Sequence, residues 1–127
     1  MDLAQLLRDT AARLPDKKAL TVASSGEEAT YAELDAEVDR IATALQATGL
    51  SKGDRVAVGL PNSLQFVVAY FAVLRAGGVM IPLNIMLTTS EVKKVLFDSG
   101  ARVAVTMDPF LDAVRKGAES TQVKHVI

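Results

Sequence analysis

The 127-residue sequence contains no cysteine and no tryptophan, and its single histidine is His125. The absence of cysteine excludes disulfides, thiolate metal sites and cysteine nucleophiles, and one histidine cannot form a multi-histidine metal site. The apolar C-terminal surroundings of His125 favour a structural or partly exposed role over a functional one. A formal net charge of −1 provides no basic surface for nucleic acid, so we expect no nucleic-acid partner.

The sequence also lacks the motifs that hold phosphates or activate a nucleophile. Neither G-x-G-x-x-G nor G-x-x-x-x-G-K-[ST] is present, no serine has a histidine near it, and G-x-S-x-G is missing. Asp35 and Asp39 are one helical turn apart, but on a charged face, which favours solvation over acid–base work. We therefore predict no catalytic residue and no metal ligand in this chain.

A secretory signal is not expected either, because the first residues, DLAQLLRDTAARL, are charged and amphipathic rather than continuously apolar. Together with the absence of cysteine, this pattern agrees with a cytoplasmic protein. Half of the residues are hydrophobic, which is enough for one α/β core at this length. The sequence makes no prediction about membrane association.

The stretch from Asp54 to Thr88 predicts a right-handed βαβ unit. Arg55 to Leu60 is short, β-branched and uninterrupted, as in a strand that is buried on both faces of a parallel sheet. Asn62 or Ser63 is placed to cap the following helix, in which residues 66–74 carry no charge. Such a helix should lie inside a layered protein, and it is too short to span a bilayer. Val79 to Leu83 is expected to form a second buried strand.

The flanking segments supply further helices and strands. Leucines at helical spacing predict a helix over residues 3–14, with Asp2 as its cap, and residues 19–30 predict a small hairpin. The S/T-x-x-E spacing occurs twice, at Thr30 with Glu33 and at Thr88 with Glu91, and each pair predicts a capping box that begins a helix.

The C-terminal quarter predicts a third buried strand, a short helix and a fourth strand. Arg102 to Thr106 forms the strand, and Asp108 and Pro109 are expected to cap and open a helix from Phe110 to about Gly117. Val123 to Ile127 is the fourth strand, at which the sequence stops without shielding the last edge of the sheet. We therefore expect the sequence to be truncated from a longer chain, and we expect no domain boundary within residues 1–127.

The predicted fold is three-layer α/β, with a predominantly parallel sheet, helices on both faces and a small amino-terminal β-hairpin. Five motifs follow one another in the sequence: T-Y-x-E-L, G-D-R-V-A, P-N-S, A-G-G with P-L-N, and D-S-G-A-R. In this order and spacing, the chain resembles the amino-terminal part of acyl-CoA synthetases, in the acyl-adenylate-forming, AMP-binding enzyme family.

The resemblance implies a parent ligase that uses ATP and Mg²⁺ to convert a carboxylic acid to an acyl-adenylate, and then transfers the acyl group to coenzyme A. The family's phosphate loop, metal-binding residue and ribose-binding aspartate lie in later segments, so we expect this fragment to be inactive and structural. The resemblance thus implies that residues 1–127 are a single amino-terminal subdomain of a longer ligase. Its partner would be the remaining catalytic portion of the same polypeptide.

The resemblance also implies that coenzyme A approaches two places in this chain. They are the loop from Asn84 to Thr88 and the side chain of Arg115, whose fork of donors suits a phosphate. Solvation of Arg115 is the simpler interpretation. The alternative function is a free-standing flavodoxin-like or receiver-like binding module. A receiver needs an acidic cluster at the strand ends, whereas Pro61 and Asn62 follow the first buried strand here.

Overall fold

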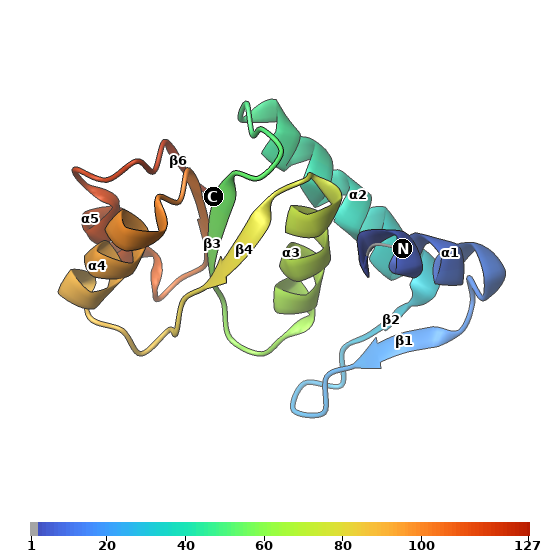
Figure 1. Cartoon of the computed structure of the whole chain (residues 1–127). Helices are drawn as coiled ribbons and strands as arrows, with labels where there is room; N and C mark the ends of the chain where they lie inside the picture. Colours follow the sequence, from blue (N-terminus) through green and yellow to red (C-terminus); the bar gives the residue numbers. More distant parts are fainter. Residues whose placement is uncertain (1–2) are drawn as a thin grey trace.

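The chain forms a four-stranded parallel sheet between helices, and a separate two-stranded hairpin (Figure 1). The structure is a computed structural model that describes residues 3–127, so the predicted cap Asp2 lies outside the described residues. The elements, in order, are α1 (Leu3–Arg13), β1 (Lys18–Thr21), β2 (Glu28–Thr30), α2 (Tyr31–Ala47), β3 (Arg55–Gly59), α3 (Leu64–Arg75), β4 (Val79–Pro82), α4 (Thr89–Ser99), β5 (Val103–Thr106), α5 (Leu111–Ala118) and β6 (His125–Val126).

The strands of the main sheet lie in the order β4-β3-β5-β6, and all of their pairings are parallel. Val56 of β3 is paired with Met80 of β4 on one side and with Val103 of β5 on the other. Helices α4 and α5 lie on one side of the sheet, and α2 and α3 lie on the other (Figure 1). The predicted three-layer fold, its parallel sheet and its hairpin are therefore confirmed.

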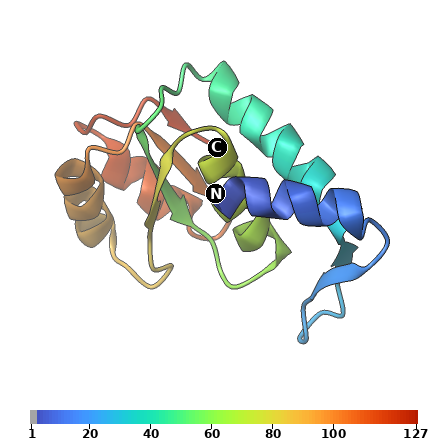
Figure 2. The ribbon, with the colours of Figure 1, turned by 45° about the vertical axis from the view of Figure 1, so that its right-hand side comes forward.

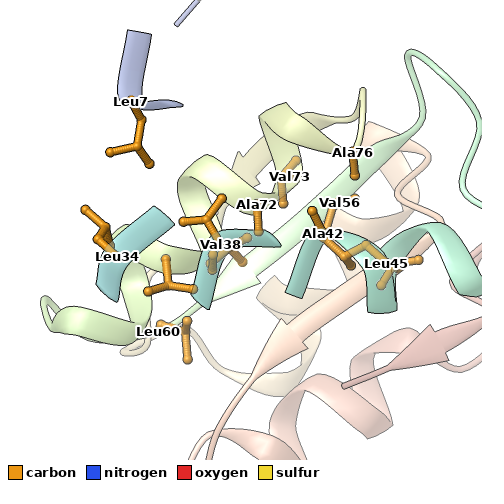
Figure 3. Close-up of a cluster of buried hydrophobic side chains, with 14 of the residues drawn as sticks. Leu7, Leu34, Val38, Ala42, Leu45, Val56, Leu60, Ala72, Val73 and Ala76 are labelled. Atoms are coloured by element: carbon orange, nitrogen blue, oxygen red, sulfur yellow. The ribbon is translucent and has the colours of Figure 1, made fainter. Parts of the chain in front are cut away.

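Alternation along β3 divides the core between the two faces of the sheet. Val56 and Val58 belong to the cluster formed with α2 and α3, part of which Figure 3 shows, whereas Ala57 belongs to the cluster under α4 and α5. Both faces of the strand are fully buried, as the uninterrupted apolar run predicts. Close packing of α5 on α4 depends on Gly117, because an added Cβ would lie 2.7 Å from Val92 Cγ1.

The predicted helix starts are largely confirmed. Thr30 with Glu33, and Thr88 with Glu91, form complete capping boxes in which each side chain accepts from the backbone of the other residue. At the start of α3 the cap is Ser63 rather than Asn62, since the Ser63 hydroxyl accepts from Phe66 N at 3.2 Å. Among the described helices, none is long and apolar enough to cross a membrane.

Three predictions about the strands and helices need correction. The strand beginning at Val79 is an edge strand, not a buried one, and Val79 is 46% exposed. Residues Asp108 and Pro109 precede α5 instead of opening it, because the residue at the cap position is Phe110. The last strand, β6, is only two residues long, although it pairs with β5 as expected.

The carboxylates of Asp35 and Asp39 form an ion-pair cluster, which corrects the prediction that they are simply solvated. Arg75, at the end of α3, points its guanidinium at both of them, with Nη2 2.6 Å from Asp35 Oδ1 and Nη1 3.1 Å from Asp39 Oδ1. Arg8 of α1 also pairs with Asp39, at 3.0 Å. Figure 2 shows α1 lying alongside α2, and the cluster connects these two helices to α3.

Candidate functional site

The carboxyl edge of the sheet contains a topological switch point, which is the usual ligand position in open α/β folds. The chain leaves β3 toward α3 on one face and leaves the neighbouring β5 toward α5 on the other. The two loops therefore diverge between the ends of adjacent strands. Counted from β3, the order β4-β3-β5-β6 equals the first four strands of the flavodoxin-like order 2-1-3-4-5. Strand order alone therefore does not distinguish the alternative functions.

The switch point is closed on the α5 side by direct packing. An added Cβ on Gly59 would lie 2.8 Å from Phe110 Cε2, so glycine allows the aromatic ring to lie against the end of β3. The Thr106 hydroxyl donates to Gly59 O at 2.9 Å and ties the two strand ends together. The Ser63 hydroxyl donates to Pro61 O and accepts from Phe66 N, so it serves as a helix cap, as we predicted.

On the other side, the switch point opens into a groove of about 670 Å³, here called the β5–β6 groove. Its floor is apolar and includes Leu60, which directly follows β3, Val68 of α3 and Val105 of β5. Met107 and Ile127 also line it, and they are 43% and 50% exposed. Glutamates from the hairpin and α2 form one wall, which we call the acidic wall: Glu27, Glu28, Glu33 and Glu37.

The predicted coenzyme A residues lie away from this groove. Asn84 and Thr88 lie at the two ends of the exposed loop between β4 and α4, and their side chains form hydrogen bonds with nearby backbone groups. Asn84 Oδ1 accepts from Met86 N at 2.8 Å, and Thr88 caps α4. Arg115 is exposed on α5, and its side chain has no hydrogen bond or ion pair with any residue in 3–127. The structure does not join Arg115 to Asn84 or Thr88 by any hydrogen bond.

The described residues offer neither a metal-binding cluster nor a glycine-rich phosphate loop. Residues 3–127 contain no cluster of three or more histidine, cysteine, aspartate or glutamate residues that could hold a metal ion. The residues therefore do not fit a Mg²⁺ site. The loop after β3 has the right position for a phosphate loop, but it reads Leu-Pro-Asn-Ser and lacks the glycines that let backbone N–H groups close on an anion.

Sequence reasoning missed two features, the Arg75 cluster and the β5–β6 groove. A signal for the first exists, because Arg75 is the only charge in an otherwise apolar helix, and Asp35 and Asp39 share one face of α2. The groove has no local signal. Its lining comes from four separate stretches of the sequence, residues 27–41, 60–69, 105–107 and 127, so only the folded chain brings them together.

Comparison with known proteins identifies longer proteins that this chain resembles. Long-chain-fatty-acid–CoA ligase of Bacillus subtilis is 41% identical over 106 residues, which are 84% of this chain and 19% of the relative. The Salmonella typhimurium ligase of the same name is 38% identical over 126 residues, 98% of this chain and 22% of the relative. The chain thus spans about a fifth of the length of these curated relatives.

Solved structures agree with this correspondence. The N-terminal domain of FACL13 from Mycobacterium tuberculosis matches with a TM-score of 0.87 and 33% identity, over 100% of this chain and 33% of that one. A long-chain-fatty-acid-CoA ligase (FadD1) from Archaeoglobus fulgidus matches with a TM-score of 0.93 and 25% identity, over 100% of this chain and 27% of that one. A free-standing flavodoxin-like or receiver-like module is therefore not favoured.

The sequence model of a protein family described as AMP-binding enzyme matches residues 7–127, which is nearly the whole chain. This match covers the switch point, both capping boxes and the complete parallel sheet. The chain belongs to the AMP-binding enzyme family.

Proposed function

We propose that this chain is the amino-terminal part of an ATP-dependent acyl-CoA ligase that acts on long-chain fatty acids. The observation that carries the proposal is the similarity of nearly the whole chain to proteins named long-chain-fatty-acid–CoA ligases, in sequence and in fold. In the parent protein, the remaining and larger part of the polypeptide follows this scaffold and performs the chemistry.

The proposed reaction proceeds in two steps. The fatty acid carboxylate attacks the α-phosphorus of ATP, and the bond between this phosphorus and the oxygen bridging to the β-phosphate breaks. Pyrophosphate is released, and an acyl-adenylate is formed. The thiolate of coenzyme A then attacks the acyl carbon, the bond to the phosphate oxygen breaks, and AMP leaves as acyl-CoA forms. Activation is needed because a carboxylate is a poor electrophile, and charge stabilisation around the phosphates requires cationic groups and backbone donors.

This chain contributes support rather than reacting groups. We place the Mg²⁺ that accompanies ATP outside residues 3–127, since no described cluster of carboxylates can hold it. Arg115 is proposed to contact the nucleotide end of coenzyme A, together with the loop between Asn84 and Thr88. The support for this is the exposure of all three residues and the free guanidinium fork of Arg115. We propose a cytoplasmic location, where ATP and coenzyme A are both supplied.

The proposal is tested with the full-length parent enzyme and purified fatty acids of increasing chain length. Acyl-CoA and AMP should form in equal amounts, only when fatty acid, ATP, Mg²⁺ and coenzyme A are all present. The 127-residue chain alone should form neither product. A parent enzyme that forms AMP with an amino acid or an aromatic acid, and not with any fatty acid, would refute the proposed substrate class.

A further inference from the structure

The β5–β6 groove is an apolar surface that the described helices leave uncovered. Helix α3 covers β3 and β4 on the side of the sheet that faces α2. On the same side, the carboxyl end of β5 is exposed. Val105 and Thr106 are only partly buried there, and Met107 is 43% exposed. An apolar hollow of about 670 Å³ is large enough to bury side chains of a further element.

The connections of the sheet indicate what kind of element covers this face. The steps from β4 to β5 and from β5 to β6 run in one direction across the sheet, and right-handed crossovers place α4 and α5 on the same face. The step from β3 to β4 runs the other way and places α3 on the opposite face. A right-handed crossover that lies on the groove side of β5 must therefore run in the same direction across the sheet as the step from β3 to β4. The chain can make such a crossover only after it has left β6.

The position of the last residues agrees with such a return. Ile127 follows β6 and lines the groove, and its N and O atoms are hydrogen-bonded to Ala104 and Thr106 of β5. The polypeptide that continues from Ile127 in the proposed parent ligase therefore starts at the groove itself. It needs no long linker to reach it.

Charge adds a constraint on the covering element. The acidic wall contributes four glutamates, whereas Arg40 is the only cation among the lining residues. Hydrogen bonds from Thr30 and Arg40 lower the pKa of Glu33 and Glu37, so these carboxylates stay ionised at neutral pH. A segment with basic side chains on one edge and apolar side chains on its face complements this groove.

We propose that the β5–β6 groove is the docking site for an amphipathic, net-basic helix of the same polypeptide, located after Ile127. Its apolar face covers Leu60, Val68 and Val105, and its lysine or arginine side chains face the acidic wall. The proposal rests on the proposed function only in requiring that the parent chain continues beyond Ile127. The helix completes the layer that α2 and α3 begin, and so connects the scaffold to the catalytic portion.

Photo-cross-linking in the full-length parent enzyme tests which segment occupies the groove. The photoreactive amino acid p-benzoylphenylalanine replaces Met107 in one variant and Gln65 in another, since both residues line the groove and they belong to different segments of the chain. A third variant carries it at Met86, which is 83% exposed in the loop before α4 and lies outside the groove. Mass spectrometry then identifies the cross-linked peptides.

We expect the probes at Met107 and Gln65 to cross-link, within one molecule, to the same peptide from the region after residue 127. That peptide should carry a net positive charge, and the probe at Met86 should not reach it. Cross-links confined to residues 1–127, cross-links to a second copy of the protein, or a net-acidic captured peptide would each overturn the proposal.

A labelling experiment gives an independent readout of coverage. In the full-length Met107→Cys variant, maleimide should react with the introduced thiol at least tenfold more slowly in the native protein than in urea. Adding Glu27→Lys, which reverses a charge of the acidic wall, should speed native labelling several-fold. Glu119→Lys, on the exposed end of α5, serves as the matched control and should leave it unchanged.

Equal labelling rates in the native and unfolded protein would overturn the proposal, and so would identical effects of the two lysine substitutions. Neither readout depends on enzymatic activity. A parent protein that shows the cross-links but forms no acyl-CoA would refute the proposed function and still support the docking site. An active ligase without the cross-links would refute the docking site and still support the proposed function.

Discussion

Replacement of Arg75 by methionine tests whether the ion-pair cluster holds α3 to α2. The Arg75 side chain is only 9% exposed, and its guanidinium contacts the Asp35 carboxylate at 2.6 Å, the Asp35 carbonyl at 3.1 Å and the Asp39 carboxylate at 3.1 Å. Methionine keeps the apolar stem but removes the charge and every donor. The variant therefore isolates the polar contribution of the side chain from its packing.

The expected cost follows from the burial of the partners. Removing one member of a fully buried pair costs about 3–5 kcal/mol, because the other charge is left without compensation. Here the side chains of Asp35 and Asp39 are 24% and 55% exposed, so water can reach both once arginine is gone. We expect Arg75→Met to lower the free energy of unfolding by about 2 kcal/mol, which corresponds to a decrease in Tm of roughly 8 °C.

The assay is urea unfolding of the 127-residue chain, followed by circular dichroism. Asp35→Asn and the double variant complete a cycle, and we expect a coupling free energy of about 1–2 kcal/mol between the two side chains. The control is Arg40→Met, which removes an exposed cation paired with Glu37 on α2 and should leave the midpoint unchanged. A coupling free energy of zero, or equal effects of Arg75→Met and Arg40→Met, would refute the reasoning.

Three further predictions concern α5 and the helix caps. Gly117→Ala should lower the free energy of unfolding by about 1–2 kcal/mol in the same assay, because the added Cβ meets Val92 at 2.7 Å and this clash outweighs the better helix propensity of alanine; an unchanged or higher midpoint would contradict it. Backbone hydrogen bonds hold the pKa of Glu33 and of Glu91 below its ordinary value, so their stabilisation is present at neutral pH and is lost as the pH falls below about 4. The double variant with glutamine at both positions should show a smaller loss of stability between neutral and acid pH, and an unaltered pH profile would contradict this. In the parent enzyme, Arg115→Ala should raise KM for coenzyme A about fivefold and leave KM for ATP unchanged, whereas equal changes in both would argue against contact with coenzyme A.

Much of the fold could be predicted because local signals agreed with the tertiary structure. The two S/T-x-x-E capping boxes fixed the starts of α2 and α4, and the uninterrupted run of β3 marked a strand buried on both faces. These signals act over a few residues and depend little on distant contacts. The motif order then indicated the family, which the comparisons confirm.

The errors concern properties that only the tertiary structure decides. The apolar run at Val79 is equally compatible with a central or an edge strand, and the strand order β4-β3-β5-β6 leaves it at the edge. The caps also depend on context. Asn62 and Ser63 are both suitable residues, but only the Ser63 hydroxyl reaches Phe66 N in the folded chain.

The candidate site was less predictable than the fold. Asp35 and Asp39 occupy a charged face of α2 in the sequence, and only the packing of α3 brings Arg75 within reach of them. The β5–β6 groove likewise depends on which face α4 and α5 cover, since that choice leaves the carboxyl end of β5 open. The coenzyme A contacts of Asn84, Thr88 and Arg115 stay predictions.

The most direct measurement for the central claim is fatty-acid-dependent ATP–pyrophosphate exchange, compared between the full-length parent enzyme and the 127-residue chain. The account predicts exchange in the parent that requires both fatty acid and Mg²⁺, and none in the chain alone. Two results would contradict the claim that this is the scaffold of a fatty-acid-activating ligase. One is exchange catalysed by the isolated chain, and the other is a parent enzyme for which no fatty acid supports exchange.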